Sequence, residues 1–183
     1  MSRLKEECGV FGIFDNKDAA ALTALGLHAL QHRGQEGCGI VTFDKKNFYA
    51  ERRLGLVGDN FTKGKVLEKL PGSYAIGHTR YSTTGSSNER NAQPFKVTGS
   101  HGTLALAHNG NVINAAELRE ELIGAWDCNF QTSTDSEVIA HLLVNAPGED
   151  WGQRTAYIMR RLRGAFSQVI LLPDSIIAMI GKT

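Results

Sequence analysis

A single cysteine at the head of an apolar, strand-like run constrains this chain most. The run Cys8-Gly9-Val10-Phe11-Gly12-Ile13-Phe14 is preceded only by the charged leader of residues 1–7. The leader is too polar to join a core and too short to form a domain, so we expect it to be disordered or removed. Its removal makes Cys8 the first residue, with a thiol nucleophile and a free α-amine of pKa about 8 as general base. The alternative is a buried structural cysteine.

The composition indicates one globular domain that handles small polar substrates. The 183 residues are 42% hydrophobic, which is enough for a single substantial core. The 20 basic and 19 acidic residues are scattered without blocks, so we expect no nucleic-acid partner and no membrane partner. The three cysteines are widely spaced, which argues against a disulfide framework, and no apolar run is long enough to span a membrane. With no secretory segment behind Met1, we expect a cytoplasmic protein.

Hydrophobic periodicity predicts strands interleaved with helices. After the opening strand, the predicted strands are 38–43, 48–52, 74–78, 103–107, 165–172 and 176–180, and the predicted helices are 19–31, 66–70, 115–123, 136–144 and 151–163. In the first helix, Leu22, Leu25 and Ala29 recur at helical spacing and are expected to face the core. The order gives an α+β fold with antiparallel strands.

Two capping boxes are expected at helix starts. Asn114 precedes helix 115–123 with Glu117 three residues later, and Thr134 precedes helix 136–144 with Glu137 in the same relation. Asp135 then falls in the first helical turn, where its carboxylate either compensates the helix dipole or binds an ammonium group.

Three polar features are candidates for chemistry. Arg80 follows a predicted strand and opens a long polar loop, so it is either a surface arginine or a group that grips a carboxylate. Asn109-Gly110 is by itself a tight-turn signal, but an Asn amide beside a Gly N–H also offers two donors to one oxyanion. A zinc site at His28, His32 and Cys38 lacks a fourth ligand, so we predict no metal and expect these histidines to bind local carbonyls.

Five ordered motifs together resemble the class II glutamine amidotransferases, and within them the glutaminase half of the amidophosphoribosyltransferase family. They are Cys8-Gly9-Val10-Phe11-Gly12-Ile13, Leu30-Gln31-His32-Arg33-Gly34-Gln35-Glu36-Gly37, Gly77-His78-Thr79-Arg80-Tyr81-Ser82-Thr83, Ala107-His108-Asn109-Gly110-Asn111 and Thr134-Asp135-Ser136-Glu137.

The resemblance implies roles for single residues. Cys8 is implied as the nucleophile that attacks the amide of L-glutamine after the leader is cut away. Arg80 and Thr83 are implied to hold the α-carboxylate of the substrate, and Asp135 its α-ammonium. Asn109 and Gly110 are implied as the oxyanion hole, and Arg33 as part of the loop that borders the site and responds to a partner domain.

The same resemblance implies a four-layer αββα N-terminal nucleophile hydrolase sandwich. We expect residues 1–7 to be a propeptide and residues 8–183 a glutaminase domain whose C-terminal part is truncated and whose phosphoribosyltransferase domain is absent. In the full-length enzyme that domain uses the ammonia to turn phosphoribosyl pyrophosphate into phosphoribosylamine, the first step of purine biosynthesis. Mg²⁺, and in some relatives a 4Fe-4S cluster, belong to that domain, and we expect no cofactor in this chain. The full-length protein is expected to be a homo-oligomer.

Two alternatives stay open on the sequence alone. The ammonia acceptor is decided by residues outside this chain, so a sugar phosphate or aspartate can replace phosphoribosyl pyrophosphate. An uncut leader would leave Cys8 without its free amine, so the chain can also be an inactive glutamine-binding or interaction fragment.

Overall fold

The computed structural model describes residues 8–62, 65–81 and 89–182. The strands are β1 (Gly9–Ile13), β2 (Gly37–Phe43), β3 (Phe48–Leu54), β4 (Tyr74–Arg80), β5 (Phe95–Gly99), β6 (Gly102–Val112), β7 (Gly164–Leu171) and β8 (Ile176–Lys182). The α-helices are α1 (Ala19–Ala29), α2 (Val57–Phe61), α3 (Ala115–Trp126), α4 (Asp135–Asn145) and α5 (Trp151–Met159). Short 3-10 helices are η1 (Gln31–Arg33), η2 (Leu67–Lys69) and η3 (Glu89–Asn91).

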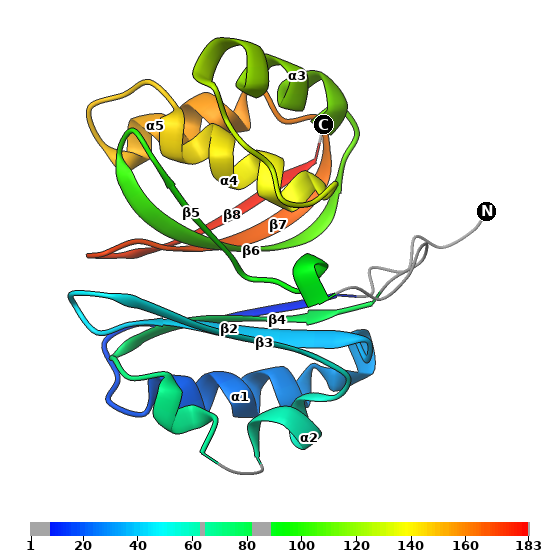
Figure 1. Cartoon of the computed structure of the whole chain (residues 1–183), viewed down its shortest axis with the longest axis vertical. Helices are drawn as coiled ribbons and strands as arrows, with labels where there is room; N and C mark the ends of the chain where they lie inside the picture. The colour runs from blue at the N-terminus through cyan, green and yellow to red at the C-terminus, as the bar shows by residue number, and fades with distance from the viewer. Residues whose placement is uncertain (1–7, 63–64, 82–88, 183) are drawn as a thin grey trace.

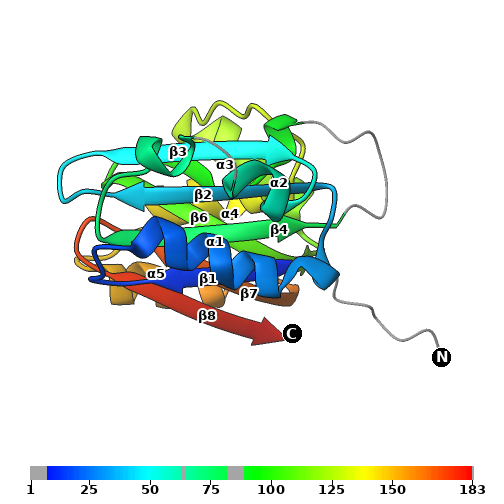
Figure 2. The ribbon, with the colours of Figure 1, turned by 90° about the horizontal axis from the view of Figure 1, so that it is seen from below.

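The elements form four layers, α-β-β-α (Figure 1). One antiparallel sheet has the order β1-β4-β2-β3 and the other β5-β6-β7-β8. Helices α1 and α2 cover the outer face of the first sheet, and α3, α4 and α5 cover that of the second. Seen from below, α1 lies across the first sheet (Figure 2). The expected α+β class and αββα sandwich are therefore confirmed.

Three apolar clusters fill the spaces between the layers. The largest packs the second sheet against its helices, with Leu106, Ile139 and Leu143 fully buried. A second packs α1 against the first sheet. The third lies between the sheets and includes Ile76 from the first sheet and Ala107 from the second. Each strand that contributes to two clusters does so with alternate residues, as a pleated strand requires.

The predicted buried face of α1 is wrong. Leu25 is 65% exposed, and the buried positions include Thr23, Ala24 and Leu27 instead. Small residues let the helix approach the sheet closely, since a Cβ at Gly26 would lie 2.6 Å from the ring of Phe11. The spacing of Leu22 and Leu25 therefore pointed to the wrong side of the helix, whose contact face combines Leu27 with small residues.

The Asn109-Gly110 pair is not a turn, contrary to the signal of the dipeptide. Strand β6 continues through both residues to Val112, where it pairs with Gly164 of β7. Gly110 has φ +138°, and a Cβ there would lie 2.2 Å from the carbonyl oxygen of Ala165. Glycine is required here because both the backbone angle and the neighbouring strand exclude a side chain.

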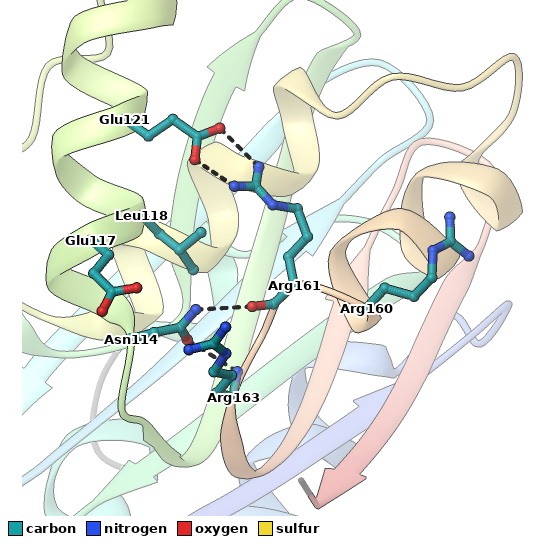
Figure 3. A pocket seen from close by; sticks show the side chains of 7 residues that line it. All are labelled: Asn114, Glu117, Leu118, Glu121, Arg160, Arg161 and Arg163. Carbon is teal, nitrogen blue, oxygen red and sulfur yellow. Dashed lines mark hydrogen bonds and ion pairs between the residues drawn. The ribbon is translucent and has the colours of Figure 1, made fainter.

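The predicted capping box at Asn114 is also wrong. Asn114 makes no side-chain capping bond to α3. Its amide nitrogen instead donates to the carbonyl of Arg161 at 2.9 Å, and its amide oxygen accepts from the backbone N–H of Arg163 at 3.0 Å. Figure 3 shows this side chain turned toward the segment between α5 and β7, on the wall of a pocket of about 280 Å³. Arginine and glutamate side chains both line that pocket, so its charges indicate no single ligand chemistry.

The second predicted cap is half right. The Thr134 hydroxyl accepts from the backbone N–H of Glu137 at 3.4 Å, as expected. The Glu137 carboxylate does not return to Thr134 but accepts from the backbone N–H groups of Gln131 and Thr132, both at 2.8 Å. It therefore orders the loop before α4.

The remaining boundaries differ modestly from expectation. The hairpin of β2 and β3 is confirmed, with Phe43 opposite Phe48. The expected helix 66–70 is the 3-10 turn η2, α5 ends at Met159 rather than 163, and α2 was not predicted. No helix in the described ranges is long and apolar enough to cross a membrane. The leader of residues 1–7 and Thr83 lie outside the described residues.

Asn114→Ala tests the observed bridge against the expected capping box. We expect it to lower the free energy of unfolding by about 1–3 kcal/mol, because it leaves the part-buried Arg161 carbonyl and Arg163 N–H without their partner. Glu117→Ala is the matched control and should change it by less than about 0.5 kcal/mol, since Glu117 is exposed. Urea denaturation measures both, and a Glu117→Ala loss as large as that of Asn114→Ala would restore the capping box.

Candidate active site

Strand alternation directs several candidate residues to the space between the two sheets. Val10 of β1, Ile76 of β4 and Ala107 of β6 belong to the inter-sheet cluster. Residues two positions further along each strand share that face. Arg80 therefore lies on the same face of β4 as Ile76, and Asn109 lies on the same face of β6 as Ala107. Cys8 directly precedes β1 and is two positions from Val10, so it is on the same side as Val10. The candidate groups meet where these strands end.

Cys8 is half-buried at this end of the sheets. Its thiol lies 3.8 Å from the carbonyl oxygen of Tyr81, and its own carbonyl accepts from Nε of Arg33 at 2.9 Å. Burial raises the pKa of the Cys8 thiol above its usual value, while the positive charges of Arg80 and Arg33 oppose that rise and the charge of Asp135 adds to it. The thiol is therefore mainly protonated at neutral pH, and its use as a nucleophile requires a base.

Arg33 and Arg80 are brought together by a close backbone contact. Arg33 ends the 3-10 helix η1, and Arg80 ends β4. Between them, a Cβ at Gly34 would lie 2.7 Å from the carbonyl carbon of Arg80, so only glycine lets the η1 loop rest on this strand. The backbone N–H of Glu36 donates to the Arg80 carbonyl at 3.1 Å and holds the loop there.

Asn109 and Gly110 lie in β6 beyond its last rung with β5, where the strand stays paired with β7. The Asn109 side chain is part-exposed and forms no hydrogen bond with any described residue, so its amide donor is free for a ligand. Gly110 is exposed in the same strand. A donor fixed on a strand rather than on a tight turn is already ordered before a ligand arrives.

Asp135 is tied to the end of β6 from the first turn of α4. Its Oδ2 accepts from the backbone N–H of Val112 at 3.0 Å, and its Oδ1 lies 3.3 Å from the Ser136 hydroxyl and 3.6 Å from Nδ1 of His108. Burial by itself would raise the pKa of Asp135, but the bonds from His108 and from the backbone outweigh it and the pKa lies below its usual value. The side chain keeps 21% exposure, so an ionised carboxylate faces the site.

A buried polar group underlies these residues, and the sequence analysis did not find it. Gln93, His108 and Ser136 are hydrogen-bonded to one another, and Nε2 of His78 lies 3.0 Å from the carbonyl oxygen of His108. His78 joins the two sheets in this way. Full burial lowers the pKa of His78 to about 3, so its ring is neutral and donates this bond. A histidine inside a short apolar strand was the available signal.

The other thiols and histidines lie elsewhere. Cys38 faces the α1 side of its sheet, where burial raises the pKa of its thiol to about 12. His32 contacts the carbonyl oxygen of Ala29 at 3.2 Å, as expected for a histidine at a helix end. Within the described ranges, no group of three or more His, Cys, Asp or Glu residues is arranged to hold a metal ion.

A family model described as "Glutamine amidotransferase domain" matches residues 78–179. The chain belongs to the glutamine amidotransferase family. The matched range includes Arg80 at the end of β4, Asn109, Gly110 and Asp135, and the membership confirms the resemblance drawn from the five motifs. The family is one of enzymes.

Relatives and solved structures agree with this assignment. The chain is 50% identical over 96% of its length to an amidophosphoribosyltransferase of Rhizobium etli and 47% identical over 96% to one of Synechocystis. It aligns with a TM-score of 0.83 and 39% identity to a glutamine phosphoribosylpyrophosphate amidotransferase from B. subtilis solved with ADP and GMP, over 93% of this chain and 36% of that one. A structure described as the allosteric regulatory enzyme of purine biosynthesis aligns at 0.85 with 40% identity, over 93% of this chain and 37% of that one. The chain spans only about a third of the two curated relatives, 35% and 36% of their lengths.

His78→Gln should flatten the pH dependence of stability. The pKa of His78 is near 6.5 in the unfolded chain and about 3 in the folded protein. Between these values the unfolded state therefore binds more protons, so the free energy of unfolding falls as the pH is lowered. The wild-type slope from this group approaches about 1.4 kcal/mol per pH unit well below pH 6.5. Glutamine keeps a donor for the His108 carbonyl. Urea denaturation from pH 7 to pH 5 compares the slopes, and parallel curves would show that His78 is not the group involved.

Proposed function

We propose that this chain, cut before Cys8, hydrolyses L-glutamine to glutamate and ammonia through a thioester. The convergence of Cys8 with the positive charges of Arg33 and Arg80 and the carboxylate of Asp135 is the observation that carries the proposal. The site offers a nucleophile, cations for an α-carboxylate, an anion for an α-ammonium and a free amide donor at Asn109. These match the functional groups of glutamine one by one.

The chemistry follows from the groups present. The α-amine of Cys8 takes the thiol proton, and the thiolate sulfur forms a bond to the amide carbon of the substrate. The negative charge that develops on the amide oxygen is stabilised by Asn109 and the backbone of Gly110. The intermediate then breaks its carbon–nitrogen bond, the leaving nitrogen takes the proton back, and ammonia departs. Water attacks the resulting thioester and releases glutamate with the free thiol.

Arg80 and Asp135 bind the end of the substrate that does not react. The guanidinium of Arg80 suits a carboxylate, and the ionised Asp135 suits an ammonium. By resemblance Thr83 joins Arg80, and Arg33 holds the carbonyl of Cys8 at the border of the site. Binding these two charges fixes the amide relative to the thiol, which is the condition for a fast intramolecular attack.

In a longer protein, we propose that the ammonia passes to a phosphoribosyltransferase domain and converts phosphoribosyl pyrophosphate to phosphoribosylamine. The names of the two relatives support this, since both are amidophosphoribosyltransferases. Mg²⁺ and any 4Fe-4S cluster belong to that domain in the proposal. A cytoplasmic location and a homo-oligomeric full-length protein remain predictions.

Removal of residues 1–7 should switch the activity on. An amide nitrogen between Glu7 and Cys8 is not a base, so the uncut chain should release ammonia at least a hundredfold more slowly than the chain that begins at Cys8. Coupled glutamate detection with intact-mass analysis of each sample measures this, and Cys8→Ser in the cut chain is the control. Full activity in a sample that retains the leader would exclude the α-amine as base, and no activity in the cut chain would favour a glutamine-binding fragment.

Asn109→Ala and Asp135→Asn should separate chemistry from binding. Asn109 acts on the charge that develops in the transition state, so its loss should lower kcat about 10² to 10³-fold with little change in KM. Asp135 binds a charge already present in the substrate, so Asp135→Asn should raise KM. Steady-state kinetics of the cut chain compares them, and equal losses of kcat with unchanged KM would contradict the separate roles.

A further inference from the structure

Gln93 lies two residues before the start of β5. In the antiparallel register Phe95 lies opposite Leu106, so the next rungs would place Gln93 opposite His108. Strand β5 begins at Phe95 and therefore stops short of this rung. The side-chain oxygen of Gln93 takes the place of the missing backbone acceptor and receives the backbone N–H of His108 at 2.7 Å. A side chain thus continues the ladder beside Asn109.

The nitrogen of the same side-chain amide reaches α4. Nε2 of Gln93 donates to the hydroxyl of Ser136 at 3.0 Å. Ser136 is buried in the first turn of α4, directly after Asp135. One side chain therefore joins the residue before Asn109 to the residue after Asp135.

Gln93 is itself held by burial and by close contact with β2. Its side chain is almost completely buried, with 8% of the residue exposed. The backbone carbonyl oxygen of Gln93 lies so close to β2 that a Cβ at Gly39 would approach it to 2.2 Å. Gln93 is therefore seated on the first sheet while its amide reaches the second sheet and α4. Because Gln93 contacts β2, β6 and α4 at once, it restricts the movement of these elements relative to one another.

The hydrogen bonds around Ser136 have a defined direction. An amide nitrogen only donates, so the Ser136 oxygen accepts from Gln93 and keeps its own proton for another acceptor. Nδ1 of His108 lies 2.9 Å from the same oxygen, and Oδ1 of Asp135 lies 3.3 Å away. With Nδ1 of His108 as a second donor, the serine proton points to the Asp135 carboxylate. The chain of bonds that starts at Gln93 ends on the substrate-binding group.

We propose that Gln93 is a positioning and specificity-determining residue that, together with the bond from the Val112 N–H to the Asp135 carboxylate, fixes the separation between Asn109 and Asp135. This rests on the proposed function, in which these two residues bind opposite ends of one substrate. Asp135 receives the α-ammonium and Asn109 the amide oxygen, so their separation measures the length of the substrate side chain. A fixed separation favours glutamine over asparagine, which is shorter by one methylene group.

The variant Gln93→Met keeps the size of the side chain and removes both hydrogen bonds. Its matched control is Gln168→Met, because Gln168 lies directly across from His108 on β7, is also buried, and its amide forms no hydrogen bond with any described residue. Ser136→Ala is a second variant that breaks only the link to α4. All are made in the chain that begins at Cys8, and thermal melts establish that each is folded.

The first readout is hydrogen exchange and needs no activity. Gln93→Met should speed exchange of the amides of residues 108–112 and of the first turn of α4, and Ser136→Ala only the latter. Gln168→Met should affect neither. Unchanged exchange in Gln93→Met overturns the positioning role whether or not the wild-type chain hydrolyses glutamine.

The second readout is the ratio of kcat/KM for glutamine to kcat/KM for asparagine. Gln93→Met should lower kcat/KM for glutamine by about 10- to 100-fold, since small misplacements of binding groups have effects of this size. The ratio should fall with it, while Gln168→Met keeps the wild-type ratio. A ratio that is unchanged in Gln93→Met, or equally reduced in Gln168→Met, overturns the specificity role. A wild-type chain that releases no ammonia instead contradicts the proposed function and leaves the exchange result to decide on Gln93.

Discussion

Close face-to-face packing of the two sheets is the constraint on which the site depends. Gly12 of β1 faces the second sheet, and a Cβ there would lie 3.0 Å from a methyl group of Val169. Ala105 and Ala107 fill the same gap with small, fully buried side chains. Because strand residues alternate, this close approach brings every second residue of the facing strands together at their ends. Cys8, Arg80 and Asn109 are placed in this way.

Polar groups buried beside this apolar gap hold the site in one arrangement. His78 bridges the sheets to the carbonyl of His108, and Gln93 bridges β6 to α4. Unpaired polar groups at these depths would be costly, so each bond that is present restricts the local geometry strongly. Apolar contacts stabilise the sandwich, while these few hydrogen bonds determine the positions of the polar groups at the ends of its strands.

Much of the secondary structure could be predicted because period-two and helical patterns are local. The β2–β3 hairpin and the strands β7 and β8 follow from such patterns. The failures share one cause, which is that tertiary contacts replaced a local preference. Asn109-Gly110 remains in a strand because β7 pairs with it. The Asn114 side chain does not cap α3 because it forms hydrogen bonds with the backbone of Arg161 and Arg163. The buried face of α1 depends on how small residues fit Phe11, which spacing does not encode.

The sequence by itself determined the family and the candidate groups, because four of the five ordered motifs contain Cys8, Arg80, Asn109 and Asp135. Such short motifs can be recognised without knowledge of the fold. The sequence also determined that Cys8 directly precedes a strand. Only the tertiary structure decided which of these groups meet, that Cys38 faces away, and that Gln93, His108 and Ser136 support them. The physical reason is that hydrogen bonds between residues 15 to 43 positions apart depend on sheet register and layer packing, and neither is written in any single stretch of the chain.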